Sequence, residues 1–194
     1  MTYNVNHVIF QLSCYPEYFP QNSRGTSSAL SHQAVAERQP SSPATSTLCA
    51  LGIDYSETSS RLPNGKEVVR PRRLGGDGQL EVDNGTPTDA VVSLVDLQTN
   101  KAVRRFYVEA NQKFTESGIA PGTYQVYFET GSDWNLVTRS FNNCAKTQRF
   151  PNIFEEAKDE ATHVSITLHN VVGGNTTTIL VDKQSYDAMM AQSE

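Results

Sequence analysis

The most regular pattern along the chain is an alternation of apolar and polar residues in its second half. After a turn at residues 120–123, the large apolar side chains of Tyr124, Val126 and Phe128 fall at every second position. Successive side chains of a strand point to opposite faces of its sheet, so this period of two predicts a half-buried strand. Phe114 and Ile119, which flank the entry to the turn, are expected to close the same core.

The turn itself is predicted from two neighbouring residues, Pro121 and Gly122. Proline fixes φ near −65°, and glycine readily adopts the positive φ that the third position of a type II turn requires. We therefore expect a tight turn in which Gly122 has a positive φ.

Turn signals separate several further strand-like stretches. Residues 90–97 are apolar on both faces, which predicts a central strand. In residues 102–109, Phe106 and Val108 are expected to face the core and Tyr107 to face outward. Other strands are predicted over residues 80–82, 134–141, 162–172 and 177–181. About seven strands at this spacing predict a mostly β chain, folded as an antiparallel β-sandwich.

The two ends of the chain differ in their predicted structure. Asp182 is a suitable N-cap for a terminal helix in which Tyr186, Met189 and Met190 share one side. Residues 1–20 form an arm with many aromatic and aliphatic side chains and a short strand at 8–12. Either this arm packs on the sandwich or on a partner, or it becomes ordered only when bound. Its candidate contact residues are Phe10, Tyr15, Tyr18 and Phe19.

Four segments follow from these patterns. The arm, residues 1–20, precedes a linker, residues 21–77, that is rich in Ser, Thr and Pro and contains an arginine cluster at 70–73. Such a segment has too little apolar surface to offset the entropy lost on ordering, so it is expected to be flexible. Residues 78–182 form the predicted sandwich and residues 183–194 the terminal helix.

Charge and cysteine usage narrow the class of protein. The 16 basic and 21 acidic residues give a net charge of −5, which disfavours nucleic-acid binding. No apolar run reaches the roughly 20 residues of a membrane span, and the N-terminus does not resemble a signal peptide. Cys14, Cys49 and Cys144 match no disulfide framework or metal-binding spacing. Reduced thiols and a cytoplasmic location are therefore expected.

The patterns that carry enzymatic chemistry are absent from the sequence. His163 and His169 lie on one predicted strand, roughly 20 Å apart, and so cannot share a metal ion. No Gly-x-Ser-x-Gly motif and no phosphate-binding glycine loop occurs. We therefore expect no catalytic residue, metal or cofactor, and a protein that is not an enzyme.

The most distinctive loop contains the single tryptophan, Trp134, directly after Asp133. In one interpretation Trp134 is a rim residue that caps the core. In the other, an exposed indole with Tyr127 and Tyr107 nearby is a platform for a sugar or a peptide side chain.

The run Phe-Thr-x-x-Gly-Ile-x-Pro-Gly-Thr-Tyr-x-Val, which begins at Phe114, resembles a repeat of transthyretin-like, or carboxypeptidase-regulatory-like, β-sandwich domains. A longer resemblance, from about Gly78 to Asp187, is to an uncharacterised bacterial domain, found mainly in cyanobacteria, that follows kinase, J-domain or other signalling regions. It includes Arg105-Phe-Tyr-Val108, Thr130-Gly-Ser-Asp-Trp134 and Leu168-His-Asn-Val-Val-Gly-Gly-Asn175. The resemblance implies a prealbumin-like sandwich but no activity, and residues 1–77 lack kinase and J-domain motifs.

Two functions remain after these exclusions. The first is a non-catalytic protein-interaction or scaffold module, in which the N-terminal arm or an edge strand recruits another protein. The second is a carbohydrate-binding module centred on Trp134. Neither the partner nor the oligomeric state follows from the sequence.

Overall fold

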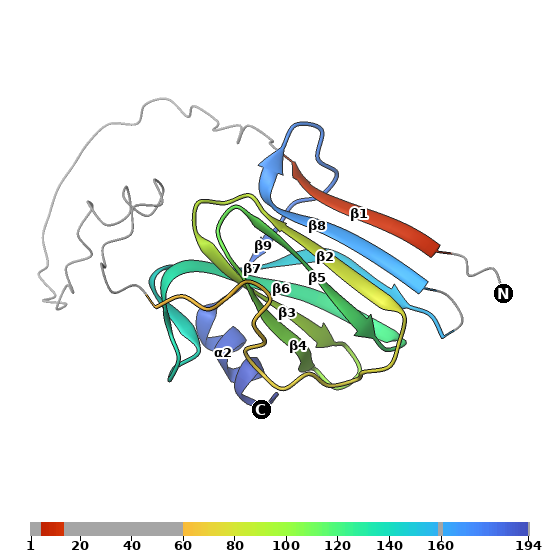
Figure 1. The fold of residues 1–194 in the computed structure, drawn as a ribbon, viewed down its shortest axis with the longest axis horizontal. Coiled ribbons are helices and arrows are strands. Elements are labelled where there is room, and N and C mark those ends of the chain that lie inside the picture. Colours follow the sequence, from red (N-terminus) through yellow and green to blue (C-terminus); the bar gives the residue numbers. More distant parts are fainter. Residues whose placement is uncertain (1–4, 14–59, 159–160, 194) are drawn as a thin grey trace, which may run out of the picture.

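The computed structural model of the chain describes residues 5–13, 60–158 and 161–193. In these residues two β-sheets lie face to face, and a short helix covers part of the outer face of one sheet (Figure 1). The predicted mostly β, two-layer fold with a short terminal helix is therefore confirmed. The predicted linker up to residue 59 and the arm residues Tyr15, Tyr18 and Phe19 lie outside the described residues.

The first sheet has four strands in the order β1-β8-β2-β5. They are β1 (Val5–Ser13), β8 (Ala161–Val171), β2 (Gly78–Asn84) and β5 (Gln112–Ile119). β8 runs parallel to both β1 and β2, while β2 and β5 are antiparallel. This sheet is thus mixed, although an antiparallel sandwich was predicted. Alternation of side chains reports which face of a strand is buried and carries no information about strand direction.

The second sheet has five strands in the order β4-β3-β6-β7-β9, all antiparallel to their neighbours. They are β4 (Lys101–Val108), β3 (Asp89–Asp96), β6 (Gly122–Asn135), β7 (Ser140–Glu156) and β9 (Ile179–Leu180). β3 is buried along its whole length, as its two apolar faces predicted. The core between the sheets includes the predicted inward residues of β6 and β8, among them Phe128, Val164 and Ile166.

Helix α2 (Lys183–Ala191) packs on the outer face of the second sheet. The Asp182 side chain accepts a hydrogen bond from the Ser185 backbone N–H. The helix residues Tyr186, Met189 and Met190 are buried against the sheet. The predicted cap and apolar face are both confirmed. The described residues contain no helical stretch with the length and hydrophobicity of a membrane span.

The segment from residue 65 to residue 72 is bound to the edge of β4, although it was predicted as part of a flexible linker. The Val68 N–H donates to the Arg105 carbonyl at 2.7 Å, and the Tyr107 N–H donates to the Lys66 carbonyl at 2.9 Å. Leu62 and Val68 pack on the outer face of the second sheet. Composition does not predict that this segment is ordered, because backbone hydrogen bonds to β4, and not a large apolar surface, hold it in place.

The predicted type II turn is wrong in one respect. Gly122 does not have a positive φ; in this region the positive φ belongs to Gly118, at 73°. Gly122 is instead required by space, because a Cβ there would lie 2.8 Å from Tyr124 Oη. The Tyr124 hydroxyl donates to the Ala120 carbonyl at 2.6 Å and thereby fixes the turn from within the strand that follows it.

Candidate functional site

The tryptophan predicted as a ligand platform is buried. Trp134 is 1% exposed and packs against Phe141 and Tyr107, with ring centroids 5.0 and 6.0 Å apart. The Arg105 guanidinium lies 5.8 Å from the centre of the indole ring. An indole enclosed in this way cannot stack on a sugar, so the predicted platform is wrong. The sequence could not show that the segment containing Leu62 and Val68 covers this face.

Of the residues predicted to lie near Trp134, Tyr107 shares its buried cluster, whereas Tyr127 belongs to another cluster. Tyr107, predicted to face solvent, is fully buried, and its hydroxyl donates to Asp89 at 2.5 Å. Tyr127 is half-buried and lies beside Tyr186 of α2, in a cluster apart from Trp134. Asp133 accepts a hydrogen bond from the Asn142 side chain at 2.9 Å, within the β6–β7 hairpin. These residues therefore do not form one binding surface.

The described part of the N-terminal arm, in contrast, is a strand at the edge of the sandwich. β1 contains the predicted strand at 8–12 and pairs in parallel with β8 along most of its length. Within the described residues, the interpretation that the arm packs on the sandwich is therefore confirmed. Phe10, a predicted contact residue, is partly buried against the core.

A short segment after β8, residues 174–176, holds the C-terminal half of β1 on the side away from β8; we call this segment the latch. The Asn175 side chain accepts from the Gln11 N–H at 2.8 Å and donates to the Ile9 carbonyl at 2.7 Å. The Asn175 N–H donates to the Gln11 carbonyl at 2.8 Å, and the Ser13 N–H donates to the Thr176 carbonyl at 2.8 Å. β1 is therefore held between β8 and the latch at this end.

Gly174 explains how the latch can approach β1 so closely. A Cβ at this position would lie 2.2 Å from the Leu12 carbonyl oxygen, so any larger residue would push the latch away. The sequence shows Gly173, Gly174 and Asn175 as a turn signal. It does not show that the turn binds a strand more than 160 residues earlier in the chain.

The N-terminal half of β1 is open on the side away from β8. The Ile9 carbonyl points to the latch side, and the backbone N–H and C=O groups of one strand residue point to the same side. His7, two residues earlier, therefore directs its backbone groups the same way. Among the described residues no strand pairs with this side of residues 5–9, which we call the free edge.

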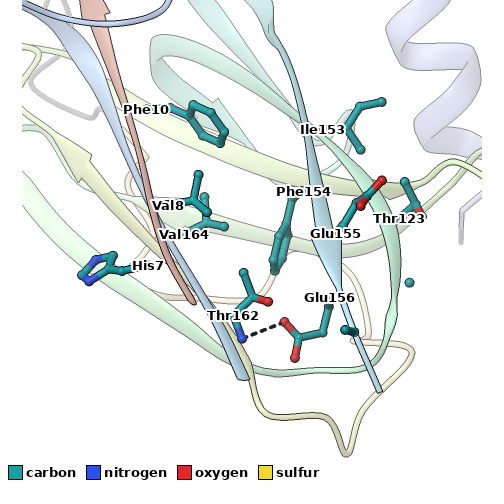
Figure 2. Close-up of a pocket in the computed structure, with 12 residues that line it drawn as sticks. His7, Val8, Phe10, Thr123, Ile153, Phe154, Glu155, Glu156, Thr162 and Val164 are labelled. Carbon is teal, nitrogen blue, oxygen red and sulfur yellow. Dashed lines mark hydrogen bonds between the residues drawn. The ribbon is translucent and has the colours of Figure 1, made fainter. Parts of the chain in front are cut away.

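Beside the free edge, the two sheets separate and leave a groove of about 620 Å³. Val8, Phe10 and Val164 form its wall on the first sheet, and Ile153 and Phe154 of β7 form the opposite wall (Figure 2). Val8 is 37% exposed and Ile153 48% exposed, so apolar surface remains accessible to solvent here. Figure 2 shows His7 pointing away from the groove.

One end of the groove is acidic. Glu156 is buried there and accepts a hydrogen bond from the Thr162 N–H at 3.1 Å. Burial raises the pKa of this carboxyl, and the Thr162 hydrogen bonds oppose that shift. The neighbouring Glu155 is exposed. A group entering this end would meet two carboxyls beside an apolar surface.

On the outer face of the first sheet, a pair of histidines connects β1 and β8. The His7 and His163 rings stack with their centroids 4.5 Å apart, and His163 Nε2 lies 3.8 Å from a Glu81 carboxylate oxygen. In the described ranges no three histidine, cysteine, aspartate or glutamate side chains gather as metal ligands would.

Comparison of the chain with protein-family models, with curated proteins and with solved structures gives no match.

Proposed function

We propose that this protein is a non-catalytic interaction module that binds an extended segment of another protein along the free edge of β1. The observation that carries this proposal is the position of an open strand edge directly beside an apolar groove. An exposed edge presents a row of backbone donors and acceptors, which a further strand can pair with.

The two features together would give affinity and specificity. Backbone hydrogen bonds to both groups of His7 and to the Ile9 N–H would align the incoming segment, because the Ile9 carbonyl already accepts from Asn175. Alternate side chains of that segment would point toward the groove. The apolar walls favour an aliphatic or aromatic side chain, and the acidic end near Glu155 favours a basic one.

An enzymatic function is not proposed. Several titratable groups have shifted pKa values, but their causes are burial and structural hydrogen bonds, as for Tyr107 with Asp89. These groups do not converge on the groove, where Glu156 faces a backbone N–H. The carbohydrate alternative depended on an exposed Trp134 and is not carried further. The net charge of −5 favours a protein partner over a nucleic acid.

The sandwich is proposed to be of the transthyretin-like type that the sequence resembles. A cytoplasmic location stays a prediction, and one observation counts against it. Cys144 is disulfide-bonded, so the expectation of three reduced thiols is wrong. Disulfides persist mainly in oxidising compartments.

Selection of binding peptides from a random displayed library, followed by fluorescence anisotropy, tests the proposal. Val8→Asp introduces a charge into the groove, and Ile9→Pro removes a backbone N–H of the free edge. Each substitution should weaken binding of the selected peptides about tenfold or more. Val137→Asp is the matched control, because Val137 is 91% exposed in the β6–β7 turn, outside the groove. Peptides that are insensitive to both β1 substitutions, or equally sensitive to the control, would contradict the proposal.

A further inference from the structure

A second hollow lies at the other end of the sandwich, where β1 and β8 finish. Its volume is about 700 Å³, within the range of small-molecule sites. The polar residues that line it include Thr86, Thr130, Lys146, Gln148, Thr177 and Thr178. We call it the polar hollow. It shares no lining residue with the groove beside the free edge.

The inner face of the second sheet changes from apolar to polar at this hollow. Thr130 follows Phe128 on the inner face of β6, and Lys146 and Gln148 precede Phe150 on the inner face of the antiparallel strand β7. Thr130 is paired with Lys146, and Phe128 with Gln148, so each pair points to the same side of the sheet. Lys146 is exposed, so the inner face of the sheet is open to solvent at this end.

The charge of the hollow differs from that of the protein as a whole. The chain has a net charge of −5, yet none of the described residues that line the hollow is an aspartate or glutamate. Lys146 is exposed, and no described carboxylate forms an ion pair with it. An ammonium group that no described carboxylate neutralises, surrounded by hydroxyl and amide groups, is suited to an anionic ligand.

The groups around Lys146 are fixed by the fold. Gln148 Nε2 donates to the Thr178 hydroxyl at 2.5 Å, and Gln148 is also paired with Leu180 of β9. At the rim, His169 Nδ1 is buried without a hydrogen-bond partner in the described part of the chain. The His169 ring lies so close to Gly85 that a Cβ there would be 2.4 Å from Nδ1. The hollow therefore has a preformed polar wall and an unsatisfied polar atom at its rim.

We propose that the polar hollow binds a small, hydroxyl-bearing organic anion with a phosphate or carboxylate group. The Lys146 ammonium neutralises the anionic group, the Thr130 and Thr177 hydroxyls form hydrogen bonds to the ligand, and Leu168 and Leu180 provide apolar contact. Because β1 contributes Leu12 and Ser13 to the lining, the bound ligand also contacts the end of the docked strand. This proposal does not depend on peptide binding at the free edge.

Titrations of the full-length protein followed by amide NMR test the proposal, with glucose 6-phosphate, citrate, inorganic phosphate and uncharged glucose as probes. Glucose 6-phosphate or citrate should shift the amides of Thr130, Lys146 and Thr177, and glucose should not. Lys146→Gln should weaken the binding about tenfold or more, since it removes a charge-assisted hydrogen bond. Lys101→Gln is the matched control, because Lys101 is an exposed lysine at the start of β4, away from the hollow.

The outcomes separate clearly. Shifts with the phosphate ester alone, or with citrate alone, support the proposal and identify the anionic group. Equal binding of glucose, equal loss in the Lys101 and Lys146 variants, or no shift with either organic anion would overturn it. Shifts that inorganic phosphate alone produces would also overturn it, since they show no recognition of an organic ligand. Circular dichroism of both variants verifies that each remains folded.

Discussion

Asn175 binds both backbone groups of Gln11: its side-chain oxygen accepts from the Gln11 N–H, and its own N–H donates to the Gln11 carbonyl, each at 2.8 Å. A third hydrogen bond, from the Asn175 side chain to the Ile9 carbonyl, extends the contact along β1. A single residue of the latch, Asn175, thus holds β1 in place. Through this contact the latch fixes the position of the free edge relative to the groove.

Substitution of Asn175 should loosen β1 without unfolding the sandwich. Asn175→Ala removes two side-chain hydrogen bonds, each worth about 1 kcal/mol. Hydrogen exchange at the β1 amides should therefore become about tenfold faster or more, while β3 amides keep their protection. Asn142→Ala, which removes a hydrogen bond to Asp133 instead, is the control. Unchanged exchange in β1 after Asn175→Ala would show that the latch does not hold the strand.

Gly174 should tolerate no side chain. Gly174→Ala places a Cβ in the space occupied by the Leu12 carbonyl, so the latch must move away from β1. We expect faster exchange in β1, as for Asn175→Ala. Gly75→Ala is the control for strain elsewhere in the fold. No atom lies within 4 Å of a Cβ at that position, but its φ of 92° strains an alanine, so this variant should lose stability without faster exchange confined to β1. A Gly174→Ala protein with native β1 exchange would contradict the close packing.

Asp89 should contribute far more to stability than its partner Arg61. The carboxylate is buried and accepts hydrogen bonds from the Arg61 guanidinium, the Tyr107 hydroxyl and the Ala110 N–H. Asp89→Ala leaves the buried Tyr107 hydroxyl without its acceptor and should cost about 3 kcal/mol or more. Arg61 has a side chain that is 52% exposed, so Arg61→Ala should cost about 1 kcal/mol. Chemical denaturation measures both, and equal costs would contradict the proposed network.

Glu129 should make stability depend on pH. This fully buried carboxyl lies below α2, and its pKa is raised by burial, against the opposing effects of Lys183, the Phe141 N–H and Arg105. The folded state therefore binds the proton more tightly than the unfolded state, so ionisation of Glu129 destabilises the fold as pH rises above the ordinary value of 4.5. Asp187 nearby acts in the same direction.

The test for Glu129 is Glu129→Gln, which cannot ionise. We expect the variant to be more stable than the natural protein at neutral pH by about 1 kcal/mol, with the difference decreasing as the pH falls toward 4.5. Thermal denaturation of both proteins across this range measures it. A difference that is constant with pH, or of opposite sign, would mean that Glu129 is stabilised as an anion in the folded protein.

Much of the fold follows from local patterns. The alternation in β6 and β8, the doubly apolar β3, and the Asp182 cap with its three buried helix residues depend on interactions within one element. Such features are visible in sequence because the period of the apolar residues reports the buried face directly.

The features that the sequence patterns predicted wrongly, or did not show, depend on contacts between residues distant in the sequence. Trp134 and Tyr107 lie on the outer face of the second sheet. The segment that contains Leu62 and Val68 covers them, and backbone hydrogen bonds to β4 and to Trp134 hold that segment in place. The latch is likewise a turn by composition, and its partner Gln11 has no local signal. Parallel pairing of β1 with β8 also leaves no pattern, since strand direction does not alter alternation.

The central claim is that the free edge of β1 accepts a partner strand. NMR-detected hydrogen exchange of the full-length protein, with and without a selected peptide at saturation, tests it most directly. Pairing along the free edge should protect the His7 and Ile9 amides, which point away from β8. Peptide binding that leaves these two amides as exposed to exchange as in the unbound protein would contradict the account.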